Sequence, residues 1–158
     1  MKNRSGQSLI EVVIALAVVV ALAISLVTAS LVTQRTSRSA TSNTEATKLV
    51  QQLIEQVRVM RDRQGFVSLV NNTYSCIKNT NLDPQNWAFE TIASNCPNSG
   101  LVTLANVVFT PSIVISNGTD PAKQKKIKVT VFWTDSGGIQ SVSNDTVLSN
   151  CVSSTTSC

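Results

Sequence analysis

The sequence predicts an α+β fold in which one long N-terminal helix packs on an antiparallel β-sheet. The first observation behind this prediction is an apolar run followed by an amphipathic helical pattern, which together occupy most of the first 64 residues. The second is the alternation of apolar and polar side chains after residue 100, which is typical of strands with one buried face. With 158 residues, the chain suits one ordinary domain and an additional apolar segment.

The N-terminal segment has the composition of a membrane span. Every residue from 12 to 24 is apolar, and apolar side chains dominate up to residue 32. Residues 12–32 would form a helix about 31 Å long, which matches the roughly 30 Å hydrocarbon thickness of a bilayer. Lys2 and Arg4 precede the run and place the N-terminus on the cytoplasmic side by the positive-inside rule. We therefore expect a single-pass segment with the rest of the chain outside the cytoplasm.

Three interpretations of this segment compete: a plain anchor, a signal peptide cleaved after Ala23, and a leader cleaved after Gly6. The residue that decides among them is Glu11, because a carboxylate in the middle of a membrane costs about 3 kcal/mol and a plain anchor or signal peptide has no use for it. Cleavage after Gly6 would make Gln7 the first residue, with its α-amine one helical turn from Glu11. That amine could neutralise the carboxylate within one chain, or between chains, where it would select one stagger between packed helices.

The sequence GQSLIE, from Gly6 to Glu11, and the following VVIAL resemble the prepilin motif of the type IV pilin family. In that family a membrane-embedded peptidase cleaves after the glycine and methylates the new N-terminus, and the glutamate is needed for assembly. The resemblance therefore implies cleavage between Gly6 and Gln7, N-methylation of Gln7, and an assembly role for Glu11. One departure is that the family usually has phenylalanine after the cleavage point.

The resemblance also implies a pilin fold and a function. We expect a structural subunit of a type IV pilus or related filament, with a minor pilin favoured. The alternatives are a pseudopilin of a type II secretion system and a membrane-anchored or secreted adhesin-like binding domain. The implied partners are other pilin subunits through helix–helix packing, the prepilin peptidase, the inner membrane, and the assembly platform of the pilus or secretion system. The implied location is the bacterial inner membrane before assembly, and an extracellular filament or the periplasm afterwards.

Four segments follow from these inferences. Residues 1–6 form the leader peptide, and residues 7–33 form the transmembrane and filament-core helix. Residues 34–64 form the amphipathic half of the helix, and residues 65–158 form an extracytoplasmic β-rich domain.

Helical periodicity resumes after a Ser/Thr-rich stretch, so the chain forms one long helix or two helices with a joint near residues 34–44. Gly65 is a suitable stop, with Arg61 and Arg63 in the last turn, where the helix dipole favours cations. The spacing also pairs Glu45 with Lys48 and Glu55 with Arg58 on the polar face. The apolar stripe consists of Ala46, Leu49, Val50, Leu53, Ile54, Val57 and Met60.

The four cysteines, Cys76, Cys96, Cys151 and Cys158, all follow the helix, and none has the CxxC spacing of a zinc or redox site. An even number in a small exported domain favours disulfides over free buried thiols. Three pairings are possible. We favour the local one, Cys76–Cys96 and Cys151–Cys158, because it needs the least reorganisation of the chain.

The C-terminal half predicts an antiparallel sheet of about four strands. Residues 101–109 are rich in β-forming residues and end at Pro111, and residues 113–115 form a short strand. Residues 126–134 alternate most clearly, and an Asp-Ser-Gly-Gly turn leads to a return strand at 139–142. The side chains expected to face the core are Ile127, Val129, Val131 and Trp133.

Histidine is absent, which removes the commonest general base and the commonest metal ligand. We expect no enzymatic activity, no catalytic residue, no metal site and no cofactor. The formal charge of +4, to which Lys2 and Arg4 contribute two, is too small to imply nucleic-acid binding. A cluster of lysines is the local exception and could bind DNA or another anionic polymer, but we favour a role in guarding an edge strand against aggregation. It consists of Lys123, Lys125, Lys126 and Lys128.

Overall fold

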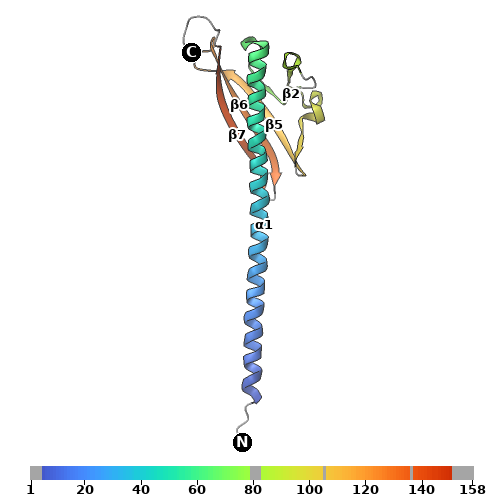
Figure 1. The fold of residues 1–158 in the computed structure, drawn as a ribbon, viewed down its shortest axis with the longest axis vertical. Helices are drawn as coiled ribbons and strands as arrows, with labels where there is room; N and C mark the ends of the chain where they lie inside the picture. Colours follow the sequence, from blue (N-terminus) through green and yellow to red (C-terminus); the bar gives the residue numbers. More distant parts are fainter. Residues whose placement is uncertain (1–4, 79–82, 105, 136, 151–158) are drawn as a thin grey trace. The chain divides into compact units, whose positions relative to one another are not determined.

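A computed structural model describes most of the chain, and the side chains of residues 5–8, 98 and 99 are outside that description. The chain divides into two compact units, Met1–Thr41 and Ser42–Cys158, which are treated separately below. The helix α1 (Ser5–Gln64) contributes to both units (Figure 1). The described residues are 5–78, 83–104, 106–135 and 137–150.

The long helix is confirmed, and α1 runs through the Ser/Thr-rich stretch without interruption. Residues 7–64 contain neither glycine nor proline, so no residue in them breaks the helical hydrogen bonding. The alternative of two helices with a joint near residues 34–44 is therefore not observed. At the C-terminal end Gly65 adopts a φ of 87°, and its N–H donates to the Arg61 carbonyl over 2.9 Å. Glycine adopts such a positive φ at the lowest energetic cost, so it is the most favourable residue for ending a helix in this way.

Among the described residues, the main antiparallel sheet has five strands. Four of them lie side by side in the order β1-β5-β6-β7. The fifth, β4, pairs with the N-terminal part of β5, whereas β1 pairs with a later part of the same strand. The α+β fold is thus confirmed, with α1 packed on an antiparallel sheet (Figure 1). The strands of this sheet are β1 (Asn72–Tyr74), β4 (Val102–Leu104), β5 (Val107–Asn117), β6 (Gln124–Asp135) and β7 (Gly138–Ser149).

The region between α1 and β4 is closed by a disulfide and contains a small second sheet. The bond predicted between Cys76 and Cys96 is present, and β2 pairs with β3 in antiparallel fashion. The Gln64 amide donates to the carbonyls of Pro84 and Trp87, over 2.8 and 2.7 Å, and so attaches this region to the end of α1. Its elements are η1 (Phe66–Ser68), β2 (Cys76–Lys78), η2 (Pro84–Asn86), β3 (Ala88–Glu90), η3 (Ala93–Asn95) and η4 (Pro97–Gly100).

The core of the second unit lies between residues 42–64 of α1 and the inner face of the main sheet. Fully burying one large aliphatic side chain there contributes about 1.5–3 kcal/mol. The rings of Phe109 and Trp133 pack in a tilted arrangement with centroids 5.8 Å apart. The predicted stripe and the predicted inward side chains are confirmed as core residues, with Leu49 and Leu53 partly buried: Ala46, Val50, Ile54, Val57, Met60, Ile127, Val129, Val131 and Trp133.

Two strand predictions were wrong. Pro111 does not end a strand but lies inside β5, opposite Val131 of β6. Proline is tolerated there because β1 and β4 pair with β5 on either side of it, which leaves its missing N–H at a gap in the edge. The return strand is also much longer than 139–142, since β7 runs to Ser149. Few of its residues are apolar, so the alternation that marks a half-buried strand is weak in it.

Candidate assembly surface

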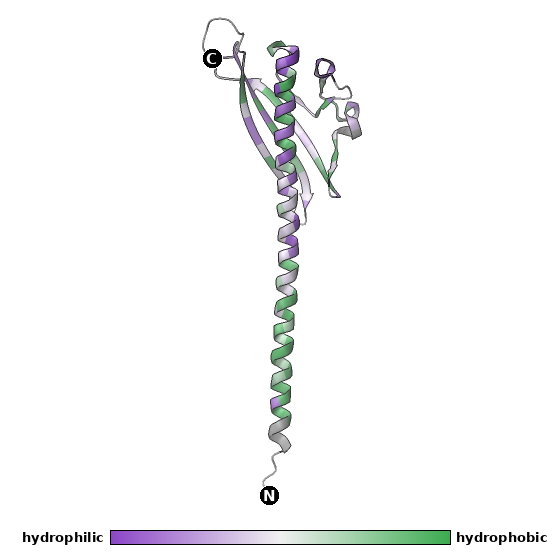
Figure 2. Ribbon diagram, viewed as in Figure 1, coloured by the Kyte–Doolittle hydropathy of each residue, from purple (hydrophilic) through white to green (hydrophobic). Residues whose placement is uncertain are grey.

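The first unit exposes a continuous apolar surface. Between residues 9 and 32 the large apolar side chains are 49% (Val20) to 73% (Leu26) exposed. Figure 2 shows this part of α1 in the green of hydrophobic residues. The helix is long and apolar enough to cross a membrane. Exposed apolar patches of this size are unfavourable in water, so the surface needs lipid or protein to cover it.

Several hydroxyl groups of this helix donate hydrogen bonds to its own backbone. The side chain of Ser25 donates to the carbonyl of Ala21, and that of Thr28 donates to the carbonyl of Ser25, both over 2.9 Å. Thr33 donates in the same way to Ala29, over 2.9 Å. Such bonds remove the cost of placing a hydroxyl in hydrocarbon. The polar residues of the run are therefore compatible with an apolar environment, whereas an ionised group is not.

Glu11 is the one acidic or basic residue between positions 9 and 32. Its side chain is exposed on α1, and in the described part of the chain no hydrogen bond or ion pair to its carboxylate is found. The backbone is already helical from Ser5, so Gln7 and Glu11 occupy positions i and i+4 on one helix face. The side chain of Gln7 and the surroundings of Gly6 lie outside the described part of the structure. In the structure, Glu11 therefore lies about one helical turn after Gln7, the residue that cleavage after Gly6 would place at the new N-terminus.

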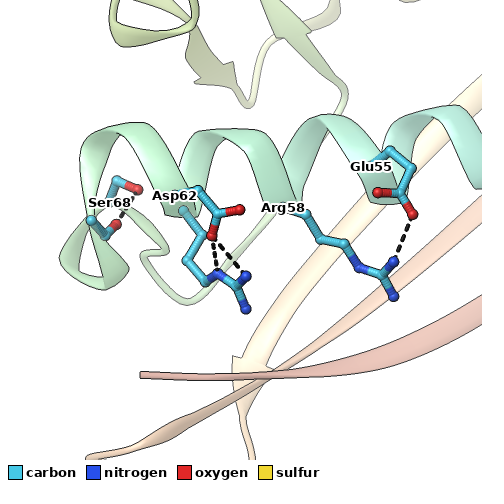
Figure 3. A network of polar contacts seen from close by, with 6 residues as sticks. Glu55, Arg58, Asp62 and Ser68 are labelled. Carbon is cyan, nitrogen blue, oxygen red and sulfur yellow. Dashed lines mark hydrogen bonds and ion pairs between the residues drawn. The ribbon is translucent and has the colours of Figure 1, made fainter. Parts of the chain in front are cut away.

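The second half of α1 presents a water-facing row of ion pairs. The predicted pairs Glu45–Lys48 and Glu55–Arg58 form, with N–O distances of 3.0 and 2.6 Å. Figure 3 shows the second pair together with the contact of the Arg61 guanidinium with Asp62. Exposed pairs of this kind contribute little to stability. Charged side chains of this kind suit a helix face in contact with water, in contrast to the apolar residues 9–32.

The lysine cluster is partly engaged within the domain. The Lys125 ammonium donates to the side-chain carbonyls of Asn71 and Asn117, over 2.7 and 2.9 Å. The Lys126 ammonium pairs with Asp145 of β7 at 2.9 Å and holds the pKa of that carboxyl below its ordinary value. The interpretation of the cluster as an edge guard was wrong, because Lys126 and Lys128 lie on β6, between β5 and β7. Binding of DNA or another polyanion stays a prediction.

A groove of about 550 Å³ lies beside α1 in the second unit. Leu49, Leu53 and Leu104 supply apolar lining, and Cys76 of the disulfide forms part of the opposite wall. The charged residues at the groove, Glu45 and Lys48, pair with each other. Gln52, Gln56 and Thr103 also line the groove, so it is of mixed polarity, and its lining does not bring reactive groups together.

The other predicted cysteine pair, Cys151 and Cys158, lies outside the described residues. In the described part of the chain, no group of three or more His, Cys, Asp or Glu side chains is arranged to hold a metal ion. Comparison of the chain with protein families, curated proteins and solved structures finds no significant match.

Proposed function

We propose that the chain is a structural subunit, a minor pilin, of a type IV pilus or related filament. The observation that carries the proposal is Glu11, a single carboxylate five residues after Gly6 on an otherwise apolar, exposed helix. A plain anchor gains nothing from an ionised group at that place and carries its cost of up to about 3 kcal/mol. A subunit whose processing creates a cation one turn away can use it.

The proposed mechanism has four steps. The apolar helix holds the precursor in the inner membrane with the β domain outside. The prepilin peptidase then cleaves between Gly6 and Gln7 and methylates the Gln7 amine. The positive amine pairs with Glu11 of its own chain in the membrane and with Glu11 of a neighbour during assembly. Apolar packing of residues 9–32 from several copies finally forms the filament core.

Apolar packing of the helices and the ion pair of Glu11 with the Gln7 amine contribute to assembly in different ways. Apolar burial is strong but has no direction, so packed helices that carry only aliphatic side chains can slide past one another. An ion pair in a low-dielectric core is favourable only when both charges are matched, so a helix out of register leaves a buried charge unpaired. The carboxylate therefore sets the stagger, while residues 9–32 provide the cohesion.

The test separates processing from assembly. Glu11→Gln keeps the size of the side chain but removes the charge, so the precursor should still be cleaved while its incorporation into filaments falls by about tenfold or more. The measurement is quantitative immunoblotting of the membrane and filament fractions. Glu55→Gln is the matched control, because it removes a glutamate from the water-facing part of the same helix and should leave incorporation unchanged. Wild-type incorporation of Glu11→Gln would contradict the role assigned to Glu11.

A further inference from the structure

The two edges of the main sheet differ. The edge formed by β5 is covered at one end by β1 and at the other by β4, with Pro111 between them. At the opposite edge, β7 forms its backbone ladder with β6, and no strand of the described residues pairs with its other side. A strand of this length with one side unpaired presents a row of backbone donors and acceptors to any extended segment that reaches it.

β7 lacks the features that usually protect such an edge. Its sequence, GIQSVSNDTVLS, contains no proline, lysine or arginine. Its pairing with β6 continues from Gly138 to Ser149 without a bulge. The one charged residue, Asp145, pairs with Lys126 of the neighbouring strand at 2.9 Å. Strand addition at this edge is therefore opposed by no kink, and the single charge on the strand already has a partner within the sheet.

The outer side chains of β7 are complementary to those of a second β7 running in the opposite direction. Ile139 and Val147 are the large apolar side chains of this strand that are most exposed, at 79% and 54%, and they lie at equal distances on either side of Ser143. An antiparallel pairing with Ser143 on a two-fold axis places Ile139 of each copy opposite Val147 of the other. The same pairing places Asp145 opposite Ser141.

Other registers are less favourable. Centring the pair on Asp145 would place two carboxylates directly opposite each other, which destabilises a cross-strand pair. Centring it on Ser141 would face Ile139 with Ser143 and leave Val147 without an apolar partner. In the Ser143 register the two Asp145 residues are about 13 Å apart, beyond the Debye length of roughly 8 Å at physiological ionic strength.

We propose that β7 is a docking edge for a second copy of this chain, and that two domains join there into one continuous antiparallel sheet centred on Ser143. The two-fold axis is perpendicular to the sheet, so the helices that pack on the two halves run in opposite directions. Such a pair does not form between neighbours of one polar filament. It joins copies that belong to two assemblies, and it does not depend on the filament role proposed above.

Disulfide trapping tests this register in the full-length chain in detergent, with Cys151→Ser and Cys158→Ser to remove competing thiols. Ser143→Cys should give an oxidised dimer, because its two copies face each other within the reach of a disulfide, about 4.4–6.8 Å between Cα atoms. Ser141→Cys is the matched control on the same exposed face, since its two copies would be about 13 Å apart. We expect at least tenfold more dimer for Ser143→Cys than for Ser141→Cys on non-reducing gels.

A second variant separates strand pairing from association through the apolar helix. Ile139→Lys adds a charge to the exposed face of β7 and should abolish trapping at Ser143→Cys while leaving the circular-dichroism spectrum unchanged. Association of α1 alone would trap both cysteines equally and would not respond to Ile139→Lys. Equal trapping of the two cysteines, no trapping at all, or trapping that survives Ile139→Lys in folded protein would each overturn the proposal. Glu11→Gln should leave trapping unchanged, so this result and the filament test can fail separately.

Discussion

At the scale of single residues, the protein is defined by where it places charge. Residues 9–32 carry one acidic or basic side chain, that of Glu11, whereas the later part of α1 carries several ion pairs on an exposed face. The hydroxyl groups of Ser25 and Thr28 in the apolar run donate to backbone carbonyls and so have no need of outside partners. The Glu11 carboxylate has no such partner in the described part of the chain. This is the physical reason for the proposal that processing creates a partner for it.

The pair between Asp145 and Lys126 predicts a contribution to stability that depends on pH. The hydrogen bond from Lys126 and its charge hold the pKa of the Asp145 carboxyl below its ordinary value. The folded state therefore binds this proton less readily than the unfolded state does. The stabilisation is fully present above the unfolded pKa and is lost as pH falls through the lower folded pKa.

Thermal unfolding of the wild type and of Asp145→Asn between pH 6 and pH 2 measures this effect. The wild type should have the higher melting temperature at pH 6, and the difference should disappear toward pH 2. A difference that stays constant over this range would contradict the assignment of the pKa shift to the native pair.

At the scale of elements, periodic sequence patterns correctly predicted the segments that have one buried face. The helix stripe around Val57 and the inward side chains of β6 were identified because a buried face repeats every 3.6 or every two residues. β7 was predicted too short because both of its faces are mostly polar, and its position is set by hydrogen bonding to β6 rather than by burial. The interruption predicted at Pro111 was wrong because its effect depends on the strand edge it faces, which local sequence does not contain.

The candidate sites were also predictable from the sequence only in part. Glu11 was identified from sequence alone, since a charge within an apolar run is visible without a structure. The open edge of β7 could not be identified, because which strand lies at an edge depends on pairing between segments distant in sequence. Three of the four lysines assigned to guard an edge, Lys125, Lys126 and Lys128, proved to lie on β6, between β5 and β7.

The disulfide is the element-scale feature with the clearest expected effect. Cys76 and Cys96 are 20 residues apart and join β2 to the segment after η3. In the chain-entropy account, closing a loop of that size stabilises the folded state by about 3 kcal/mol. Replacing both cysteines by alanine should lower the free energy of unfolding by about 2–4 kcal/mol, measured by urea denaturation of the detergent-solubilised chain.

The control for this experiment is the chain with Cys151→Ser and Cys158→Ser, treated with a reducing agent, which should unfold at the same urea concentration as the double alanine variant in the same background. Unfolding of the variant at the wild-type concentration of urea would contradict a stabilising role for this bond. A reduced control that remains more stable than the variant would assign the difference to packing of the Cys76 and Cys96 side chains instead.

At the scale of the whole molecule, the two units meet different requirements for burial. The second unit contains its own core, built from the end of α1 and the inner face of the sheet. The first contains no core in its described part, and its apolar side chains are all exposed. Apolar surface of this extent needs lipid or protein to cover it, and the filament proposed above would bury it among copies of the same helix.

The most direct measurement of the central claim is mass spectrometry of the N-terminal peptide of the exported protein. The proposed processing predicts a first residue of Gln7, and Gly6→Leu should abolish that peptide because it alters the cleavage position. A mature chain that begins at Ile24, as a signal peptide would leave it, or that retains Met1, as a plain anchor would, would contradict the account.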